Sequence, residues 1–198
     1  MKRADPYNRD TALDAAMTLF WRKGYHATSL KDLEAALDMK PGSIYAAFKS
    51  KQALFLATLE RYFLDNRQSL RTMVAEQGSP LAALAEFMRK FGCPGEAGQS
   101  NQACMVVKTM LDTTEADKVI GDAARDYLDQ MGDEFTSVFR AAERAGELPP
   151  GADPDYLAHR YQMNLTALRI EVQRGRNQAH LARLAEDLAR ELEALRPA

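Results

Sequence analysis

Apolar residues recur with the spacing of an α-helix along every long segment of this chain. Residues 9–23, for example, place Leu13, Ala16, Met17 and Phe20 on one face of an amphipathic helix. No segment alternates apolar and polar residues as a half-buried strand does. The chain is therefore predicted to be all-α, with helices over residues 9–23, 29–37, 41–48, 51–76, 80–91, 101–112, 115–145, 155–174 and 177–196.

The composition agrees with a helical globular protein. Of the 198 residues, 46% are hydrophobic and 27% are charged, and only 11 glycines and 8 prolines interrupt the helical pattern. The first ten residues lack the apolar stretch of a signal peptide, and no run of about 18 uncharged apolar residues predicts a membrane span. Two cysteines, Cys93 and Cys104, do not make a disulfide framework, so a reduced cytoplasmic setting is expected.

Charge is distributed unevenly along the chain, although the net charge is only −2. Residues 1–51 hold nine Lys and Arg against six Asp and Glu, whereas the remaining 147 residues hold 17 against 22. A mildly basic head on an acidic body suits a small module that binds a polyanion, joined to a body that does not.

Two short helices joined by a tight turn are predicted inside this basic head. Ser29 is an expected N-cap with Asp32 three residues later, and Pro41 is tolerated at the first position of the next helix. Ile44 and Phe48 then face a core at i and i+4. A helix of eight residues is unstable in water on its own, so tertiary packing must hold it. With longer helices before and after, this pattern predicts a helix-turn-helix, whose second helix enters the DNA major groove.

The side chains around residues 40–51 suit contact with DNA. Gly42 allows close approach of a phosphate, the hydroxyls of Ser43 and Tyr45 can bond phosphates or base edges, and Ala46 can lie against a thymine methyl. Tyr45 can instead be a packed aromatic, and the lysines an ordinary solvated patch. Ser29 can equally be no more than a helix cap. The candidate DNA-binding residues are Thr28, Ser29, Lys40, Gly42, Ser43, Tyr45, Ala46, Lys49 and Lys51.

Residues 12–55 resemble the DNA-binding domain of the TetR family of bacterial transcriptional regulators. The resemblance rests on Phe20, Gly24-Tyr25, Thr28-Ser29, Leu33-x-x-Ala36, Gly42-Ser43-Ile44-Tyr45-x-x-Phe48 and Ser50-Lys51. It implies a helix-turn-helix domain over residues 1–52 and a helical effector-binding and dimerisation domain over residues 53–198. Three positions depart from the family pattern: Asp38 replaces a glycine, Lys40 replaces a serine cap, and Ala46-Ala47 replaces a frequent aromatic or histidine.

The resemblance also implies a ligand cavity among the central helices. Lys108 either faces an anionic ligand or pairs with Asp112 at i+4, and the pairing is favoured. Cys93 and Cys104 are interpreted as ordinary thiols, with a thiol-based redox or electrophile sensor as the alternative. No cofactor and no metal site are predicted. The candidate ligand-binding residues are Phe87, Phe91, Cys104, Met105, Lys108, Tyr127 and Met131.

The last two predicted helices carry apolar stripes that permit two interpretations. The stripes can close the core of the monomer, or they can pack against a second copy as a four-helix bundle, which the resemblance implies. The candidate dimer-interface residues are Tyr161, Leu165, Leu168, Leu184 and Leu188.

The expected function is that of a homodimeric regulator that binds double-stranded DNA. We expect a repressor released from a pseudo-palindromic operator by a small-molecule effector. An enzyme is not expected, because His26, His159 and His180 are scattered and form no catalytic set. A protein that docks other proteins through its helical head is the remaining alternative.

Overall fold

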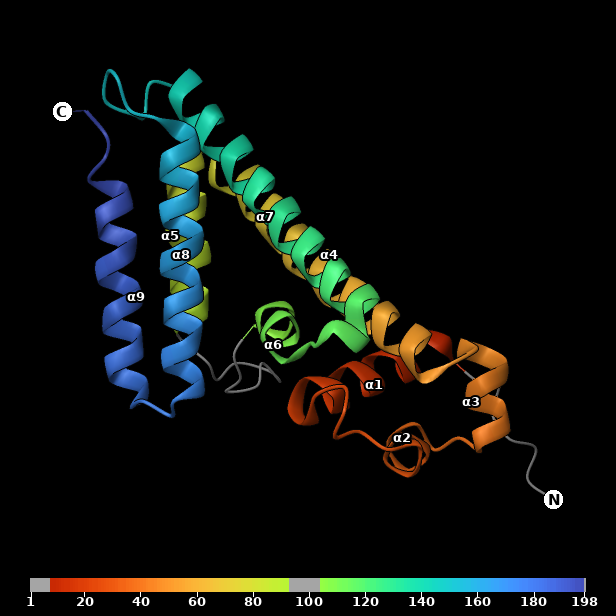
Figure 1. Ribbon diagram of the computed structural model, residues 1–198. Coiled ribbons are helices and arrows are strands. Elements are labelled where there is room, and N and C mark those ends of the chain that lie inside the picture. The colour runs from red at the N-terminus through yellow and green to blue at the C-terminus, as the bar shows by residue number, and fades with distance from the viewer. Residues whose placement is uncertain (1–7, 93–103, 198) are drawn as a thin grey trace.

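The computed structural model describes residues 8–92 and 104–197, and within these ranges it contains helices and no strand (Figure 1). The all-α prediction is confirmed. The helices are α1 (Arg9–Lys23), α2 (Leu30–Leu37), α3 (Pro41–Phe48), α4 (Lys51–Gln77), α5 (Pro80–Gly92), α6 (Met105–Asp112), the 3-10 helix η1 (Glu115–Asp117), α7 (Lys118–Arg144), α8 (Pro154–Gln173) and α9 (Gln178–Glu193).

Capping chemistry sets the ends of the short helices as the sequence predicts. Ser29 and Asp32 form a reciprocal capping box at the start of α2. Asp38 ends α2 in the left-handed conformation with φ 51° and ψ 44°, which the short aspartate side chain tolerates. Pro41 opens α3, and the Ser50 hydroxyl accepts from the backbone N–H of Ala53 at 3.0 Å to begin α4. These caps fix the turns on both sides of α3.

Apart from shifts of one residue, three predicted helices differ from the structure. The helix predicted over 101–112 is described only as α6, because residues 101–103 lie outside the described ranges. The helix predicted over 115–145 is divided into η1 and α7, since Thr114 and Asp117 form a separate capping box. The helix predicted over 177–196 ends at Glu193.

The buried apolar side chains form two clusters. One joins α1, α2 and α3 to the first half of α4, to α6 and to the start of α7. The other joins the end of α4, α5, the end of α7, α8 and α9. Helices α4 and α7 run side by side through both clusters (Figure 1). The domain boundary proposed at residue 52 therefore falls in the first turn of α4, where packing continues without a break.

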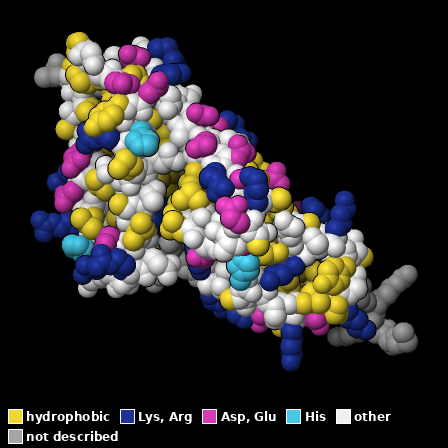
Figure 2. All heavy atoms as spheres, in the orientation of Figure 1, with side chains coloured by type: hydrophobic (Ala, Val, Ile, Leu, Met, Phe, Trp, Pro, Cys, Tyr) yellow, Lys and Arg dark blue, Asp and Glu magenta, His cyan; other side chains and the backbone are white. Residues whose placement is uncertain are grey.

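The two ends of the molecule are consequently different. Helices α1–α3 lie at one end, and α5, α8 and α9 lie together at the other (Figure 1). Figure 2 shows Lys and Arg side chains projecting from the end that carries α1–α3. Because α4 begins three positions after the last residue of α3 and its end packs in the second apolar cluster, it connects the two ends directly.

Candidate nucleic-acid interface and internal pocket

Helix α3 has one buried face and one exposed face. Ile44 and Phe48 are only 2% and 4% exposed and anchor the helix in the first apolar cluster. On the other side Gly42, Ser43 and Ala46 are exposed, and the Tyr45 side chain is 47% exposed. An exposed tyrosine of this kind is not the packed aromatic that the sequence allowed. The face therefore presents small and hydroxyl-bearing groups to the outside.

Gly42 has no structural reason inside the protein to be a glycine. A Cβ at this position meets no atom of another described segment within 4 Å, and the φ of Gly42 is not positive. Glycine in a helix costs about 0.5–1 kcal/mol relative to alanine. Close approach of another molecule's backbone is a physical reason to keep it there.

The lysines around α3 differ in whether their side chains contact the rest of the protein. Lys40 and Lys49 are exposed, and Lys49 ends the helix with φ 68°. The Lys51 ammonium lies 4.6 Å from the centroid of the Tyr25 ring, and burial lowers its pKa more than the charge of Asp32 raises it. Lys51 is thus held against the protein surface, whereas Lys40 and Lys49 project from it.

Thr28 and Ser29, predicted to hold a phosphate through backbone N–H groups, have side chains that are engaged within the protein. Thr28 is fully buried, and its hydroxyl donates to the backbone oxygen of Gly24 at 2.7 Å. Its side chain therefore supports the turn between α1 and α2 and does not face outward. Ser29 is exposed, but its hydroxyl is engaged with Asp32 in the capping box.

An ion pair fixes α2 against α1. The Lys23 ammonium lies 2.7 Å from the Asp32 carboxylate. Hydrogen bonds from Lys23, and then from the backbone and hydroxyl of Ser29, hold the pKa of Asp32 well below its usual value. Asp32 is thus ionised at neutral pH and serves both as cap and as ion-pair partner.

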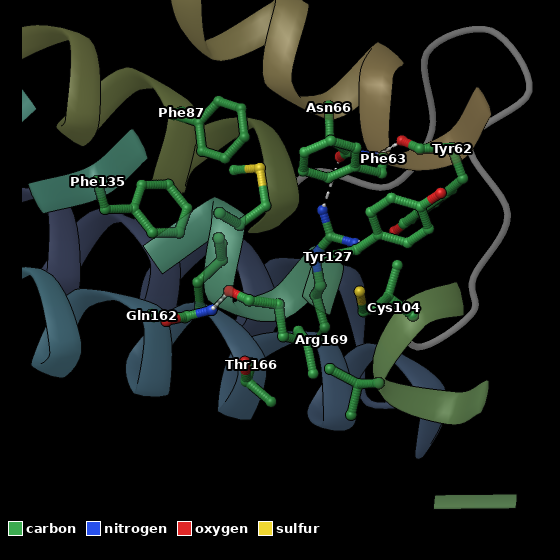
Figure 3. Close-up of a pocket in the computed structure, with 15 residues that line it drawn as sticks. Tyr62, Phe63, Asn66, Phe87, Cys104, Tyr127, Phe135, Gln162, Thr166 and Arg169 are labelled. Atoms are coloured by element: carbon green, nitrogen blue, oxygen red, sulfur yellow. Dashed lines mark hydrogen bonds between the residues drawn. The ribbon is translucent and has the colours of Figure 1, made fainter. Parts of the chain in front are cut away.

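A pocket lies where the two apolar clusters meet. It contains about 490 Å³ of space between side chains, part of which is open to solvent. Figure 3 shows aromatic rings, Arg169 and Cys104 around it. Its lining residues come from α4, α5, α6, α7 and α8 and from the residue before α6: Tyr62, Phe63, Asn66, Phe87, Cys104, Val106, Val107, Tyr127, Leu128, Met131, Phe135, Gln162, Leu165, Thr166 and Arg169.

Four of the seven predicted ligand-binding residues line this pocket: Phe87, Cys104, Tyr127 and Met131. Phe91 is not among the lining residues but packs its ring on Phe87, at a centroid distance of 4.9 Å. Met105 is 1% exposed and points into the first cluster, toward a different hollow beside α1. Lys108 lines that hollow as well.

Lys108 does not pair with Asp112 as predicted. Its ammonium donates to the backbone oxygens of Trp21 and Arg22, at 3.1 and 3.3 Å. Carbonyls in the last turn of a helix lack intrahelical partners and carry partial negative charge, so they compete well for a cation. Close by, His26 Nε2 lies 2.9 Å from the Asp117 carboxylate. The segment from α6 to the start of α7 is thereby attached to the head by polar contacts.

Sequence reasoning missed the polar side of the pocket, and above all Arg169. This arginine is 8% exposed and lies on the buried face of α8. A signal was present, because Arg169 stands four residues after Leu165 and interrupts the apolar run from Leu165 to Val172. Tyr62, Asn66 and Gln162 gave no such signal.

Three of the predicted dimer-interface residues are interior residues of the protomer. Tyr161, Leu165 and Leu168 are 1%, 7% and 3% exposed. The Tyr161 hydroxyl donates to the Leu84 backbone oxygen at 2.9 Å, which joins α8 to α5. Leu184 and Leu188 are half-buried against the same cluster. The three α8 residues therefore close the core of the monomer, which was the first of the two interpretations of this apolar stripe.

The outer face of α8 carries large apolar side chains as well. Tyr156, Met163 and Ile170 are 60%, 59% and 45% exposed and follow one another at seven-residue spacing. Residues seven apart lie on the same face of a helix. Beside this stripe, a groove between α8 and α9 is lined in part by Leu157, Leu188 and Leu192.

The described ranges contain one cysteine and no metal-binding cluster. Cys104 has a free thiol and is half-buried, and Cys93 lies outside the described residues. The residues at 8–92 and 104–197 contain no group of three or more His, Cys, Asp or Glu side chains placed to hold a metal ion. None of the helices formed by these residues is long and apolar enough to cross a membrane.

A short outward-facing helix anchored on a three-helix head, joined to a larger helical body, defines a helix-turn-helix transcriptional regulator. A family profile described as "Bacterial regulatory proteins, tetR family" matches residues 12–58. The chain is 30% identical over 189 residues to the HTH-type transcriptional repressor ComR of Escherichia coli (strain K12), covering 92% of this chain and 88% of ComR. It is also 42% identical to the repressor BdcR of the same strain over 99 residues, 50% of each chain.

Solved structures agree with these sequence relatives. A cysteine mutant of the TetR family regulator CifR, complexed with 26-bp operator DNA, superposes with a TM-score of 0.85 at 28% identity. The match covers 95% of this chain and 98% of CifR. The chain belongs to the tetR family of bacterial regulatory proteins. It is a DNA-binding transcriptional regulator and not an enzyme.

Proposed function

We propose that this protein is a ligand-responsive repressor that acts in the bacterial cytoplasm. Two copies bind a pseudo-palindromic operator through α3, and a small-molecule effector in the internal pocket releases them. The main support for this proposal is the exposed face of α3. Gly42 fills no need of the fold, and Ser43 and Tyr45 face outward, which suits close contact with a DNA backbone. ComR is named as a repressor, and CifR was solved on its operator, which supports the same activity here.

The pocket is connected to the head by two routes, which supports release by an effector. Tyr62, Phe63 and Asn66 line the pocket from α4, whose first residue follows α3 by three positions. Val106 and Val107 line it from α6, and Lys108 of the same helix bonds the carbonyls that end α1. An effector that binds one arrangement of α4 and α6 better than another changes the population of the DNA-binding arrangement.

Dimerisation is proposed through the outer face of α8 and its groove with α9. Tyr156, Met163 and Ile170 replace the three interior residues predicted for this role. Leu188, from the predicted set, lines the groove. A dimer places one α3 in each of two successive major grooves, about 34–36 Å apart.

Fluorescence anisotropy with the DNA upstream of the protein's own gene tests the repressor proposal. We expect tight binding that weakens steeply with salt, as phosphate contacts require. Tyr45→Phe and Lys40→Ala weaken binding to specific and random DNA alike, and Lys40→Ala lowers the salt slope by about one. Ser43→Ala relaxes the preference for the specific site.

The matched control is Arg144→Ala, which removes one positive charge at the far end of α7. Its binding and salt slope are expected to equal those of the parent protein. Binding that is absent, or that does not depend on salt, overturns the proposal. If Arg144→Ala and Lys40→Ala lose affinity equally, the proposed contact of α3 with DNA is wrong.

A further inference from the structure

Arg169 places a positive charge inside the protein, and no Asp or Glu of the described residues pairs with it. One guanidinium nitrogen, Nη1, donates to the Tyr62 hydroxyl oxygen, and Nη2 donates to Asn66 Oδ1 at 3.1 Å. The guanidinium stacks on the Phe91 ring at 3.7 Å from its centroid. The third nitrogen, Nε, is buried and has no hydrogen-bond partner. Among the described residues, both hydrogen-bond acceptors of this guanidinium are neutral oxygens, and the Cys104 thiol also lies close enough to interact with it.

A buried charge of this kind is costly and is normally paired. Arginine stays protonated at any physiological pH, and removing it from water without a counter-ion carries a penalty of several kcal/mol. Within residues 8–92 and 104–197 no Asp or Glu forms an ion pair with Arg169. Burial raises the pKa of Tyr62 more than the charge of Arg169 lowers it, so the phenol is protonated and supplies no negative charge.

The rest of the pocket is mainly apolar. Phe63, Phe87, Tyr127 and Phe135 surround the space with aromatic rings (Figure 3). The amide of Gln162 already donates to the Leu128 backbone oxygen at 2.8 Å. A ligand that satisfies these surroundings has an apolar body and a single anionic group, since one unpaired cation faces many carbon atoms.

We propose that the effector of this pocket is a small organic monocarboxylate whose carboxylate is bound by Arg169 and whose aromatic or aliphatic body contacts the aromatic walls. This inference rests on the proposed function of the pocket as the effector site. A planar guanidinium can donate two parallel hydrogen bonds to a planar carboxylate. The Nε of Arg169 is a donor that has no acceptor among the described residues. The Tyr62 oxygen accepts from Arg169, and a carboxylate bound there competes with the neighbouring Cys104 side chain for the Tyr62 O–H.

The same contacts give the carboxylate a means of acting on α4. Arg169 of α8 is bonded to Tyr62 and Asn66, which both belong to α4. A carboxylate competes with these two neutral acceptors for the guanidinium, because a charge-assisted hydrogen bond is stronger than a bond to a neutral oxygen. Ligand binding therefore weakens the tie between α8 and α4, the helix that leads to α3.

Matched pairs of an acid and its neutral amide test the inference by isothermal titration calorimetry on the full chain. The probes are benzoate and benzamide, cinnamate and cinnamamide, and hexanoate and hexanamide. At least one carboxylate is expected to bind about tenfold or more tightly than its amide. Arg169→Gln abolishes this preference, whereas Arg174→Gln, an exposed arginine paired with Glu171 at the end of α8, preserves it.

Tyr62→Phe provides a second variant in case Arg169→Gln does not fold. It removes only the hydroxyl and is expected to weaken the carboxylate several-fold while leaving the amide unchanged. Amides that bind as well as their acids, or three carboxylates that all fail to bind, overturn the inference.

DNA binding, measured separately, distinguishes this inference from the proposed function. If the protein binds its upstream DNA and only neutral probes bind the pocket, the carboxylate inference fails and the repressor proposal stands. If carboxylates bind and upstream DNA does not, the repressor proposal fails and the assignment of Arg169 stands.

Discussion

At the scale of single residues, helix α3 combines positions chosen for packing with positions that packing does not explain. Ile44 and Phe48 are buried, and replacing either with a small residue is expected to detach the helix from its core. Gly42 is the opposite case, because the protein leaves open space around it. A residue that costs stability and fills no internal need is best explained by what it contacts outside.

Gly42→Ala is expected to separate stability from DNA binding. Alanine lowers the entropy of the unfolded chain and meets no atom in the folded one, so the free energy of unfolding rises by about 0.4–1 kcal/mol. The added methyl keeps a phosphate away from the helix N-terminus, and affinity for operator DNA falls by roughly tenfold, the value of one charge-assisted hydrogen bond. Urea unfolding and fluorescence anisotropy measure the two effects. A more stable protein with unchanged affinity would show that no phosphate approaches Gly42.

At the scale of helices, the packing of α5 against α9 includes two ion pairs made by a single arginine. Arg89 Nε donates to Glu186 Oε2 at 2.7 Å, and Nη1 donates to Glu193 Oε1 at 2.9 Å. Hydrogen bonds from Arg89, and then from Arg190, lower the pKa of Glu186 to about 2. Since this folded value lies below the ordinary 4.5, the pairing stabilises the fold fully above pH 4.5 and is lost as the pH falls toward 2.

Arg89→Gln is therefore expected to lower Tm most at neutral pH. Partly exposed ion pairs are weak, so the decrease at pH 7 is roughly 1–4 °C. The difference from the parent protein shrinks between pH 4.5 and 2, because protonated Glu186 no longer pairs with Arg89. Thermal unfolding followed by circular dichroism across this range measures it. Arg183→Gln, which affects only an exposed pair within α9, is the control and should show little change at any pH.

Helix existence was predictable because it depends on local chemistry. The capping box at Ser29, the proline at the start of α3 and the serine before α4 are all read within four residues of chain. Which face of α8 is buried was not predictable, since both faces carry apolar stripes. Tyr161, Leu165 and Leu168 pack inward, and only the positions of α5 and α7 decide that choice.

The pocket could be predicted only in part for a similar reason. Phe87, Tyr127 and Met131 were found because large apolar residues on central helices line cavities in this family. The surroundings of Arg169 exist only once α8 packs against α4. Its hydrogen-bond partner Asn66 lies 103 positions earlier in the chain. The unpaired charge is a property of the assembled core and not of any segment.

At the scale of the whole molecule, the outer stripe of α8 is the feature that the monomer leaves unexplained. Tyr156, Met163 and Ile170 extend over about 21 Å of helix, at 1.5 Å per residue. Exposed apolar stripes of this length mark contact sites. A stable dimer buries about 800 Å² of each partner, so the proposed interface must also include residues around the groove between α8 and α9.

Met163→Asp is expected to dissociate the dimer proposed through α8. Met163 is 59% exposed in the protomer, so the fold tolerates the change, whereas an aspartate at the centre of a dimer interface is desolvated without a partner. The dimer dissociation constant rises by at least about tenfold, measured by sedimentation velocity. Leu111→Asp, at a 70% exposed leucine on α6, leaves the dimer intact as the matched control.

Because one α3 spans only a half-site, monomeric Met163→Asp also loses affinity for a full operator while keeping its weak binding to random DNA. A dimer that persists in Met163→Asp and dissociates in Leu111→Asp would move the interface from α8 to α6.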